Sequence, residues 1–308
     1  MEDPGPVRGA VLATYRYLRL AMVVLVAFLA ASVVFARLSA TCLQSTISDY
    51  YFTSAHPVFI GAICALGACL IVYQGSSNTE DALLNFSGFL AFVVALVPTA
   101  RPNRCAPTLP EGYDAAVGDN VRALLAAAAL ALLIYLPVKA RSARRRPSTT
   151  PPGPSAGGFA TFCDWLQRLL PWLLAALLLA GVAYFVAYPG QFGQHAHTWA
   201  AAAMFSGIIV VVVINALYAW QRTDRGRTGR FWVTAAYSVI AGLMFIFLLA
   251  AIVVHAEYGP GWHQWGVIAL ESALIVLFSA FWAVQTVDMW NVSDYRCVLP
   301  PRPKIAIR

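Results

Sequence analysis

The sequence predicts an all-α fold, a polytopic transmembrane bundle of about eight helices with both termini in the cytoplasm. Only 11% of the 308 residues are charged and 60% are hydrophobic, whereas roughly 25% of the residues in a soluble domain are charged. Long apolar stretches recur along the chain, and basic residues concentrate between alternate stretches. Such a chain has too little polar surface to cover a water-soluble globule.

Eight apolar stretches approach the length that a helix needs to cross a bilayer. About 20 apolar residues are required, because the backbone polar groups inside hydrocarbon must be satisfied within the segment. The third stretch is the shortest, and none of the eight alternates at the strand period typical of outer-membrane barrels. The expected spans are 18–36, 57–73, 82–97, 121–138, 169–188, 198–220, 231–254 and 266–287.

The N-terminal segment is similar to a secretory signal, because Arg8, Arg16 and Arg19 precede an apolar run. That run is too long for the hydrophobic region of a signal peptide. We therefore expect the first helix to be a retained signal anchor.

Basic residues predict the orientation, since Lys and Arg in short loops are held in the cytoplasm during insertion. All but four of the 21 Lys and Arg residues fall on one side if the N-terminus is inside. The net charge of +7 then reflects topology and attraction to anionic lipid head groups at the cytoplasmic face. The expected partners are the lipid bilayer and these head groups, and no nucleic acid is needed to explain the charge.

A change of composition divides the chain into two halves. Residues 139–168 are first basic and then rich in Pro, Ser and Gly, which indicates a cytoplasmic linker. It separates a four-helix half at 1–138 from a second at 169–288, and residues 289–308 form a cytoplasmic tail. Each half has a His near the outer start of its second helix, His56 and His197. A tandem duplication is a weaker alternative, because the surrounding residues do not otherwise align.

Two of the six cysteines lie in predicted external loops. Cys42 falls in the first and Cys105 in the second, and an oxidising compartment permits a disulfide between them. The sequence does not indicate whether they are within bridging distance.

Smaller features predict how the helices pack and end. Small residues recur at four-residue spacing over 61–69, which predicts a close helix contact. Pro137 is expected to end its helix and Pro171 to lie in a first turn. Asn215, a polar residue within a span, is expected to hydrogen-bond a neighbouring helix.

Histidines and carboxylates gather at the predicted outer ends of the helices, and Glu271 lies about one turn inside the last span. An ionisable residue in a span is costly unless it is paired or hydrated, so Glu271 is expected to face the bundle interior. Imidazoles and carboxylates can hold a divalent metal such as zinc or relay protons, or they can simply populate the membrane interface. The candidate polar site comprises Ser48, Asp49, His56, His197, His263 and Glu271.

The turn Ser-Asp-Tyr-Tyr-Phe-Thr at 48–53, followed by His56, resembles a family of bacterial polytopic membrane proteins with a domain of unknown function and an Ile-Ser-x-Tyr-Tyr-Tyr-like external turn. The similarity continues through Tyr73-Gln74-Gly75 and Glu80-Asp81, and Phe52 departs from the pattern where the family has Tyr. The resemblance implies a multi-pass protein of the plasma (inner) membrane. It implies no particular activity.

Three functional classes remain, because the sequence has no Walker A loop, GxGxxG, GxSxG or HExxH motif. A non-catalytic cell-envelope scaffold, sensor or accessory protein is favoured. A metal-dependent hydrolase of the outer leaflet, similar to membrane ceramidase-like enzymes, would use the Ser, Asp and His candidates around zinc, although their HxxxH motif is missing. A small-solute or proton-coupled transporter would centre on Glu271. Whether the protein is an enzyme stays open.

Overall fold

The structure, a computed structural model, describes residues 5–40, 43–99, 113–144, 158–224, 231–258 and 266–290. Within these ranges every regular element is helical and no strand occurs, which confirms the predicted all-α fold. One turn of 3-10 helix, η1 (Ser48–Phe52), lies between the first two α-helices. The helices are α1 (Gly5–Ser39), α2 (His56–Val72), α3 (Asn78–Leu96), α4 (Tyr113–Arg144), α5 (Gly158–Ala187), α6 (Pro189–Asp224), α7 (Phe231–Tyr258) and α8 (Gly266–Asp288).

Seven of these helices are long and apolar enough to cross a membrane, and α2 is the exception among the described elements. Its 17 residues extend about 26 Å at 1.5 Å per residue, slightly less than the roughly 30 Å of hydrocarbon in a bilayer. Large apolar side chains cover the outside of the bundle. Trp172 and Leu133, for example, are 76% and 69% exposed, as expected of surfaces that face lipid.

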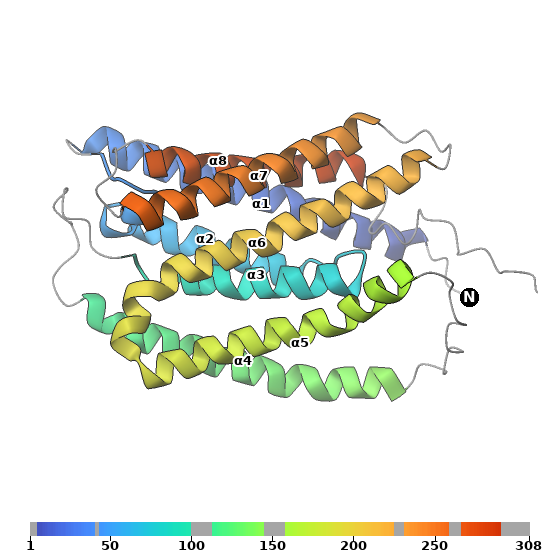
Figure 1. Ribbon diagram of the computed structural model, residues 1–308, viewed down its shortest axis with the longest axis horizontal. Helices are drawn as coiled ribbons and strands as arrows, with labels where there is room; N and C mark the ends of the chain where they lie inside the picture. The colour runs from blue at the N-terminus through green and yellow to red at the C-terminus, as the bar shows by residue number, and fades with distance from the viewer. Residues whose placement is uncertain are drawn as a thin grey trace, which may run out of the picture.

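Six helices form a closed ring. Helix α1 packs on α2, α2 on α3, α3 on α6, α6 on α7, α7 on α8, and α8 returns to α1. Helices α4 and α5 lie outside this ring against α3 and α6, along the lower edge of Figure 1. The two sequence halves therefore do not form two separate bundles. A tandem duplication would give α4 and α8 equivalent places, yet only α8 belongs to the ring.

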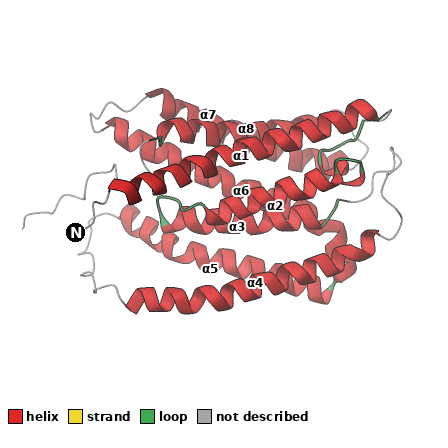
Figure 2. Ribbon diagram, turned by 180° about the vertical axis from the view of Figure 1, so that it is seen from behind, coloured by secondary structure: helices red, strands yellow, loops and turns green. Residues whose placement is uncertain are grey.

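The ring has two ends that differ in composition. Helices α1, α5 and α7 begin, and α4, α6 and α8 end, on the right in Figure 1. We call this the basic end, because the predicted cytoplasmic Lys and Arg residues lie near these termini in the sequence. The opposite end carries η1, seen as a short loop-bounded turn between helices in Figure 2, and we call it the η1 end.

Several helix boundaries differ from the prediction. The predicted linker 139–168 is partly helical, because α4 continues to Arg144 and α5 begins at Gly158. Pro137 and Pro171 lie inside α4 and α5, so the predictions that they end or begin a helix are wrong. Apolar length defines only the part of a helix in hydrocarbon, whereas backbone hydrogen bonding extends through the polar flanks. Membrane helices also tolerate an internal proline.

Gly67 of α2 and Gly88 of α3 form a close helix contact. A Cβ atom placed on Gly67 would lie 2.7 Å from the Gly88 carbonyl oxygen, and one on Gly88 would lie 2.6 Å from the Gly67 carbonyl oxygen. Gly61, which begins the predicted small-residue face, has no neighbour within 4 Å of such an atom. The close contact of α2 thus lies at Gly67, which is not one of the residues Gly61, Ala65 and Cys69 of the predicted face, so that prediction is wrong at Gly61.

Candidate functional site

The segment that carries η1 folds across one end of the ring and is held by its own side chains. The backbone N–H of Thr46 donates to Asp49 Oδ2 at 3.1 Å, and the Asp49 N–H donates to Thr46 Oγ1 at 2.9 Å. Burial raises the pKa of Asp49, and hydrogen bonds to its carboxyl group from the Thr46 side chain and from the Thr46 and Ser45 backbone oppose the shift. Tyr50, Tyr51 and Phe52 are at most 2% exposed, so the turn is firmly anchored in the bundle.

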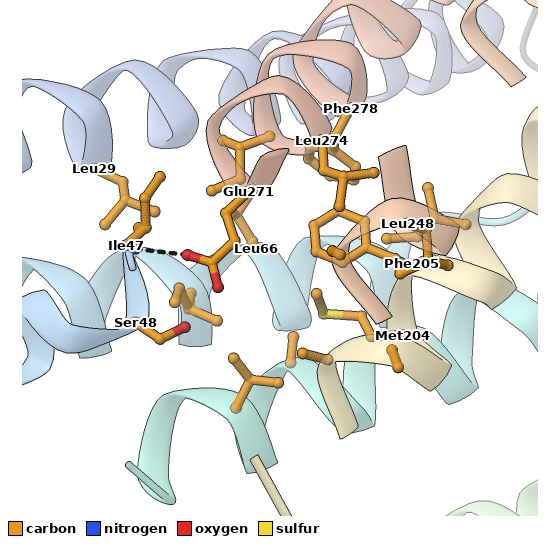
Figure 3. A pocket seen from close by; sticks show the side chains of 18 of the residues that line it. Leu29, Ile47, Ser48, Leu66, Met204, Phe205, Leu248, Glu271, Leu274 and Phe278 are labelled. Carbon is orange, nitrogen blue, oxygen red and sulfur yellow. Dashed lines mark hydrogen bonds between the residues drawn. The ribbon is translucent and has the colours of Figure 1, made fainter. Parts of the chain in front are cut away.

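Glu271 reaches this segment from the second turn of α8. Its Oε2 accepts a hydrogen bond from the Ile47 backbone N–H at 2.6 Å, just before η1 begins. The carboxyl group thereby ties α8 to the η1 segment. As expected from the sequence, Glu271 faces the interior of the bundle, where it lines a cavity (Figure 3).

His197 reaches the same segment from α6. Its Nδ1 lies 2.7 Å from the Val97 carbonyl oxygen, and its Nε2 lies 2.8 Å from Ser48 Oγ. A carbonyl oxygen can only accept, so Nδ1 carries the proton and, in the neutral ring, Nε2 accepts from the Ser48 hydroxyl. His197 is 4% exposed, and its interactions join α6 to the end of α3 and to η1.

Ser48, His197 and Glu271 thus meet at η1, while the other candidates face elsewhere. His56 Nδ1 lies 2.7 Å from the Tyr51 carbonyl oxygen, and its ring packs edge-on against that tyrosine. Asp49 is engaged by Thr46. His263 lies outside the described residues. Cys42 and Cys105 lie there too, so their disulfide stays a prediction.

A zinc site does not form among the residues that the structure describes, since no three His, Cys, Asp or Glu side chains gather there. Both ring nitrogens of His197 are engaged in hydrogen bonds within the protein. The ceramidase-like arrangement, which needs several imidazoles around one metal ion, therefore lacks its ligand set in this part of the chain.

A cavity of about 180 Å³ lies at the centre of the six-helix ring, directly inside η1. We call it the ring cavity. Side chains from all six ring helices line it, and nearly all are apolar; Leu248, Leu274 and Phe278 surround its interior in Figure 3. Its polar lining residues are Ser48, Thr198 and Glu271. The cavity thus has a long apolar body and one polar end.

A second, larger cavity of about 420 Å³ lies outside the ring, among α3, α4, α5 and α6. We call it the outer cavity. Its lining is apolar and aromatic, including Phe89, Leu125 and Trp199, and it contains no charged side chain. Lipid chains can fill such a space without specific recognition, so the ring cavity is the better candidate for a binding site.

A buried polar network closes the other side of the ring, towards the basic end. The Arg19 Nε–H donates to the Tyr73 hydroxyl at 3.1 Å, and Tyr73 donates to Gln285 Oε1 at 3.2 Å. Gln285 Nε2 donates to Asn215 Oδ1 at 3.0 Å, and Asn215 Nδ2 donates to Glu80 Oε1 at 2.8 Å. All five residues are at most 4% exposed, so they connect α1, the end of α2, α3, α6 and α8 through the protein interior.

The two charged members of this network are fixed by further backbone contacts. Arg19 Nη1 donates to the Met289 carbonyl oxygen at 3.1 Å, and its guanidinium lies over the Tyr73 ring. Glu80 Oε2 accepts from the Ser76 N–H at 2.7 Å, and the Ser77 side chain caps the start of α3.

Sequence reasoning missed this network because it counted Arg19, at the start of the first expected span, among the cytoplasmic basic residues and placed Glu80 before the third span. Both lie within helices, since α1 begins at Gly5 and α3 at Asn78. The expectation that Asn215 bonds a neighbouring helix is met, because it bonds Gln285 of α8 as well as Glu80. A detectable signal was Ser77-Asn-Thr-Glu80, the spacing of a helix capping box.

The fold and its spans define a helical multi-pass membrane protein with a cavity inside the bundle. No protein-family model matches the chain, and no curated protein or solved structure matches it either. The resemblance to the bacterial family carried by 48–53 therefore stays a prediction, and function has to be argued from the site.

Proposed function

We propose that the protein is a non-catalytic sensor or accessory protein of the membrane that binds a small amphiphile in the ring cavity. The observation that carries the proposal is a cavity lined by apolar side chains, with Glu271 and Ser48 at one end. An amphiphile would place its apolar part among Leu274, Phe278 and Leu248 and its polar part at η1. Ligand sites of this kind pair an apolar lining with a few positioned polar groups.

A hydrolase is less well supported, although Ser48 and His197 have the spacing of a nucleophile and its base. Acyl transfer also needs hydrogen-bond donors for the negative charge that develops on the substrate oxygen. The Ile47 N–H, a backbone donor next to Ser48, already donates its hydrogen bond to Glu271. A carboxyl group at that place would oppose the negative charge instead of stabilising it.

A small-solute transporter is the second candidate, and one observation favours it. The ring cavity lies between η1 at one end and the Arg19–Glu80 network on the other side. A transporter needs such a space, closed in turn from each side of the membrane. The same cavity would then hold the solute during passage.

Binding is tested by filling the ring cavity. Ala202 lines the ring cavity, while its neighbour Ala203 lines the outer cavity. With the neutral probe 2-phenylethanol and protein in lipid nanodiscs, we expect Ala202→Phe to weaken binding at least about tenfold, because the new ring occupies the site. Ala203→Phe should leave binding unchanged. Equal binding by both variants and the wild type would locate the probe outside the ring cavity and refute the proposal.

For orientation, we propose that the basic end faces the cytoplasm and contacts anionic lipid head groups of the plasma (inner) membrane. The distribution of Lys and Arg supports this. A reporter inserted near Ser155 or fused after Arg308 should then report cytoplasm, and one near Glu111 should report the exterior. If the insertions near Ser155 and Glu111 report the same side, α4 does not cross the membrane and the proposed orientation fails.

A further inference from the structure

In the described part of the chain, the polar end of the ring cavity is lined by a carboxyl group and two hydroxyls but by no positively charged group. Of the described residues that line it, only Ser48, Thr198 and Glu271 are polar, and none carries a positive charge. A ligand in this cavity meets a carboxyl group and two hydroxyls at one end and hydrocarbon elsewhere. The Thr198 hydroxyl can donate or accept, so the roles of Ser48 and Glu271 decide which polar head fits.

The Ser48 hydroxyl faces the ligand as an acceptor. The Val97 carbonyl oxygen fixes the proton of His197 on Nδ1, so Nε2 accepts a hydrogen bond from the Ser48 hydroxyl, with 2.8 Å between Nε2 and Oγ. Once its proton is directed at His197, Ser48 Oγ can offer only lone pairs to a molecule in the cavity. The two hydrogen bonds that link Ser48, His197 and the Val97 carbonyl thus make the Ser48 hydroxyl an acceptor towards the cavity.

Glu271 adds a second hydrogen-bond acceptor, a carboxyl group that can carry a negative charge. Its Oε2 is held by the Ile47 N–H at 2.6 Å, so the carboxyl group is fixed in orientation. Asp49, on η1, is close enough to Glu271 for the two carboxyl groups to interact electrostatically. The basic residue described nearby, Arg37, directs its guanidinium to the Ala40 carbonyl oxygen and does not line the cavity. The polar end therefore offers a ligand hydrogen-bond acceptors, including the Glu271 carboxyl group, and no cation among the described lining residues.

We propose that the ring cavity selects small amphiphiles whose polar head is an amine, bound as an ammonium group against Glu271 and Ser48. This inference rests on the proposed function and specifies its ligand. An ammonium group offers three donors and no acceptor, which complements acceptors on the cavity wall. Hydrogen bonds between an ammonium and a carboxylate are about twice as strong as neutral ones, and the apolar surroundings strengthen their attraction.

The size of the cavity limits the apolar part of the ligand. Its volume of about 180 Å³ slightly exceeds the roughly 150 Å³ of an engineered apolar cavity that holds benzene. A single ring with a short chain therefore fits, whereas a two-chain lipid does not. The ligand class is a primary amine on one aromatic ring or a short alkyl chain.

Three probes of nearly equal shape test the choice of head group. They are 2-phenylethylamine, 2-phenylethanol and phenylacetate, which present a cationic, a neutral and an anionic head. Binding is measured by equilibrium dialysis against the full chain in nanodiscs, and the Ala202→Phe variant in the same lipid supplies the value to subtract for partitioning. For the wild type we expect the amine to bind at least about tenfold more tightly than the alcohol, and phenylacetate not to bind.

Glu271→Gln tests the residue that carries the selection. The amide keeps the size of the side chain and removes the negative charge, so the amine should lose its advantage over the alcohol while the alcohol still binds. Glu271→Asp, which keeps the charge, should keep part of the preference. If Glu271→Gln fails to fold, the ranking of the three probes on the wild type still decides the question.

The outcomes separate the two proposals. If neither amine nor alcohol binds the wild type above the Ala202→Phe value, the cavity is not a ligand site, and the proposed function and this inference both fail. If the alcohol binds as tightly as the amine, or if Glu271→Gln keeps the preference for the amine, the inference fails and the proposed function stands. Binding of phenylacetate as tightly as the amine would also overturn the inference.

Discussion

Replacing Glu80 with alanine is expected to lower the free energy of unfolding by about 3 kcal/mol or more. Removing one partner from a buried charge pair typically has an effect of this size. Glu80 is 1% exposed and accepts hydrogen bonds from Asn215 and the Ser76 backbone. Its loss leaves two buried donors without their acceptor. It also removes the negative charge that accompanies Arg19 in the interior, where both charges act on Tyr73.

Glu80→Gln and Asp119→Asn give the comparison that this prediction needs. Glu80→Gln keeps a hydrogen-bond acceptor, so its effect should be smaller than that of alanine. Asp119 forms an ion pair with Arg122 on α4, where both side chains are more than 70% exposed, and Asp119→Asn should change stability by at most a few tenths of a kcal/mol. Stability is measured by thermal unfolding in one detergent. Equal melting temperatures for Glu80→Ala and Asp119→Asn would contradict the role given to the network.

Gly67→Ala and Gly88→Ala are each expected to cost about 1–3 kcal/mol, the usual effect of overpacking. The new methyl group of either variant would lie within 2.7 Å of a backbone carbonyl oxygen on the facing helix. A backbone atom cannot move aside without separating α2 from α3, so two adjacent walls of the ring would have to shift.

Gly61→Ala is the matched control, because it places the same methyl group on the same helix with no neighbour within 4 Å. It should leave stability unchanged or raise it slightly, since alanine favours helix more than glycine does. Unfolding by denaturant ranks the three variants. If Gly61→Ala is destabilised as much as Gly67→Ala, the close α2–α3 contact is not what the glycines maintain.

The helices themselves could be predicted from composition, but their arrangement could not. Apolar length identifies spans, and all eight expected stretches lie within or next to the observed helices. The order of helices around the ring depends on contacts between distant residues, such as Gly67 with Gly88 and Arg19 with the Met289 carbonyl. Apolar faces of similar composition do not reveal these pairings, because lipid-facing and helix-facing surfaces are both hydrophobic.

The candidate site was partly predictable. The sequence predicts that Ser48, His197 and Glu271 lie at the same end of the helices, and the structure brings them to the same turn. His56 and Asp49 share that level too, but each is engaged by a backbone or side-chain group a few residues away. Local hydrogen bonding of this kind depends on the path of η1, which hydropathy does not predict.

The central claim, that the ring cavity holds a small amphiphile with its head at η1, is tested most directly by locating a bound probe. A crystal structure with 2-(4-bromophenyl)ethylamine would give the bromine position from anomalous scattering. We predict one bromine among Phe278, Leu274 and Met204, with the amine nitrogen within hydrogen-bond distance of Glu271. Bromine found only on the lipid-facing surface, or in the outer cavity beside Trp199, would contradict the account.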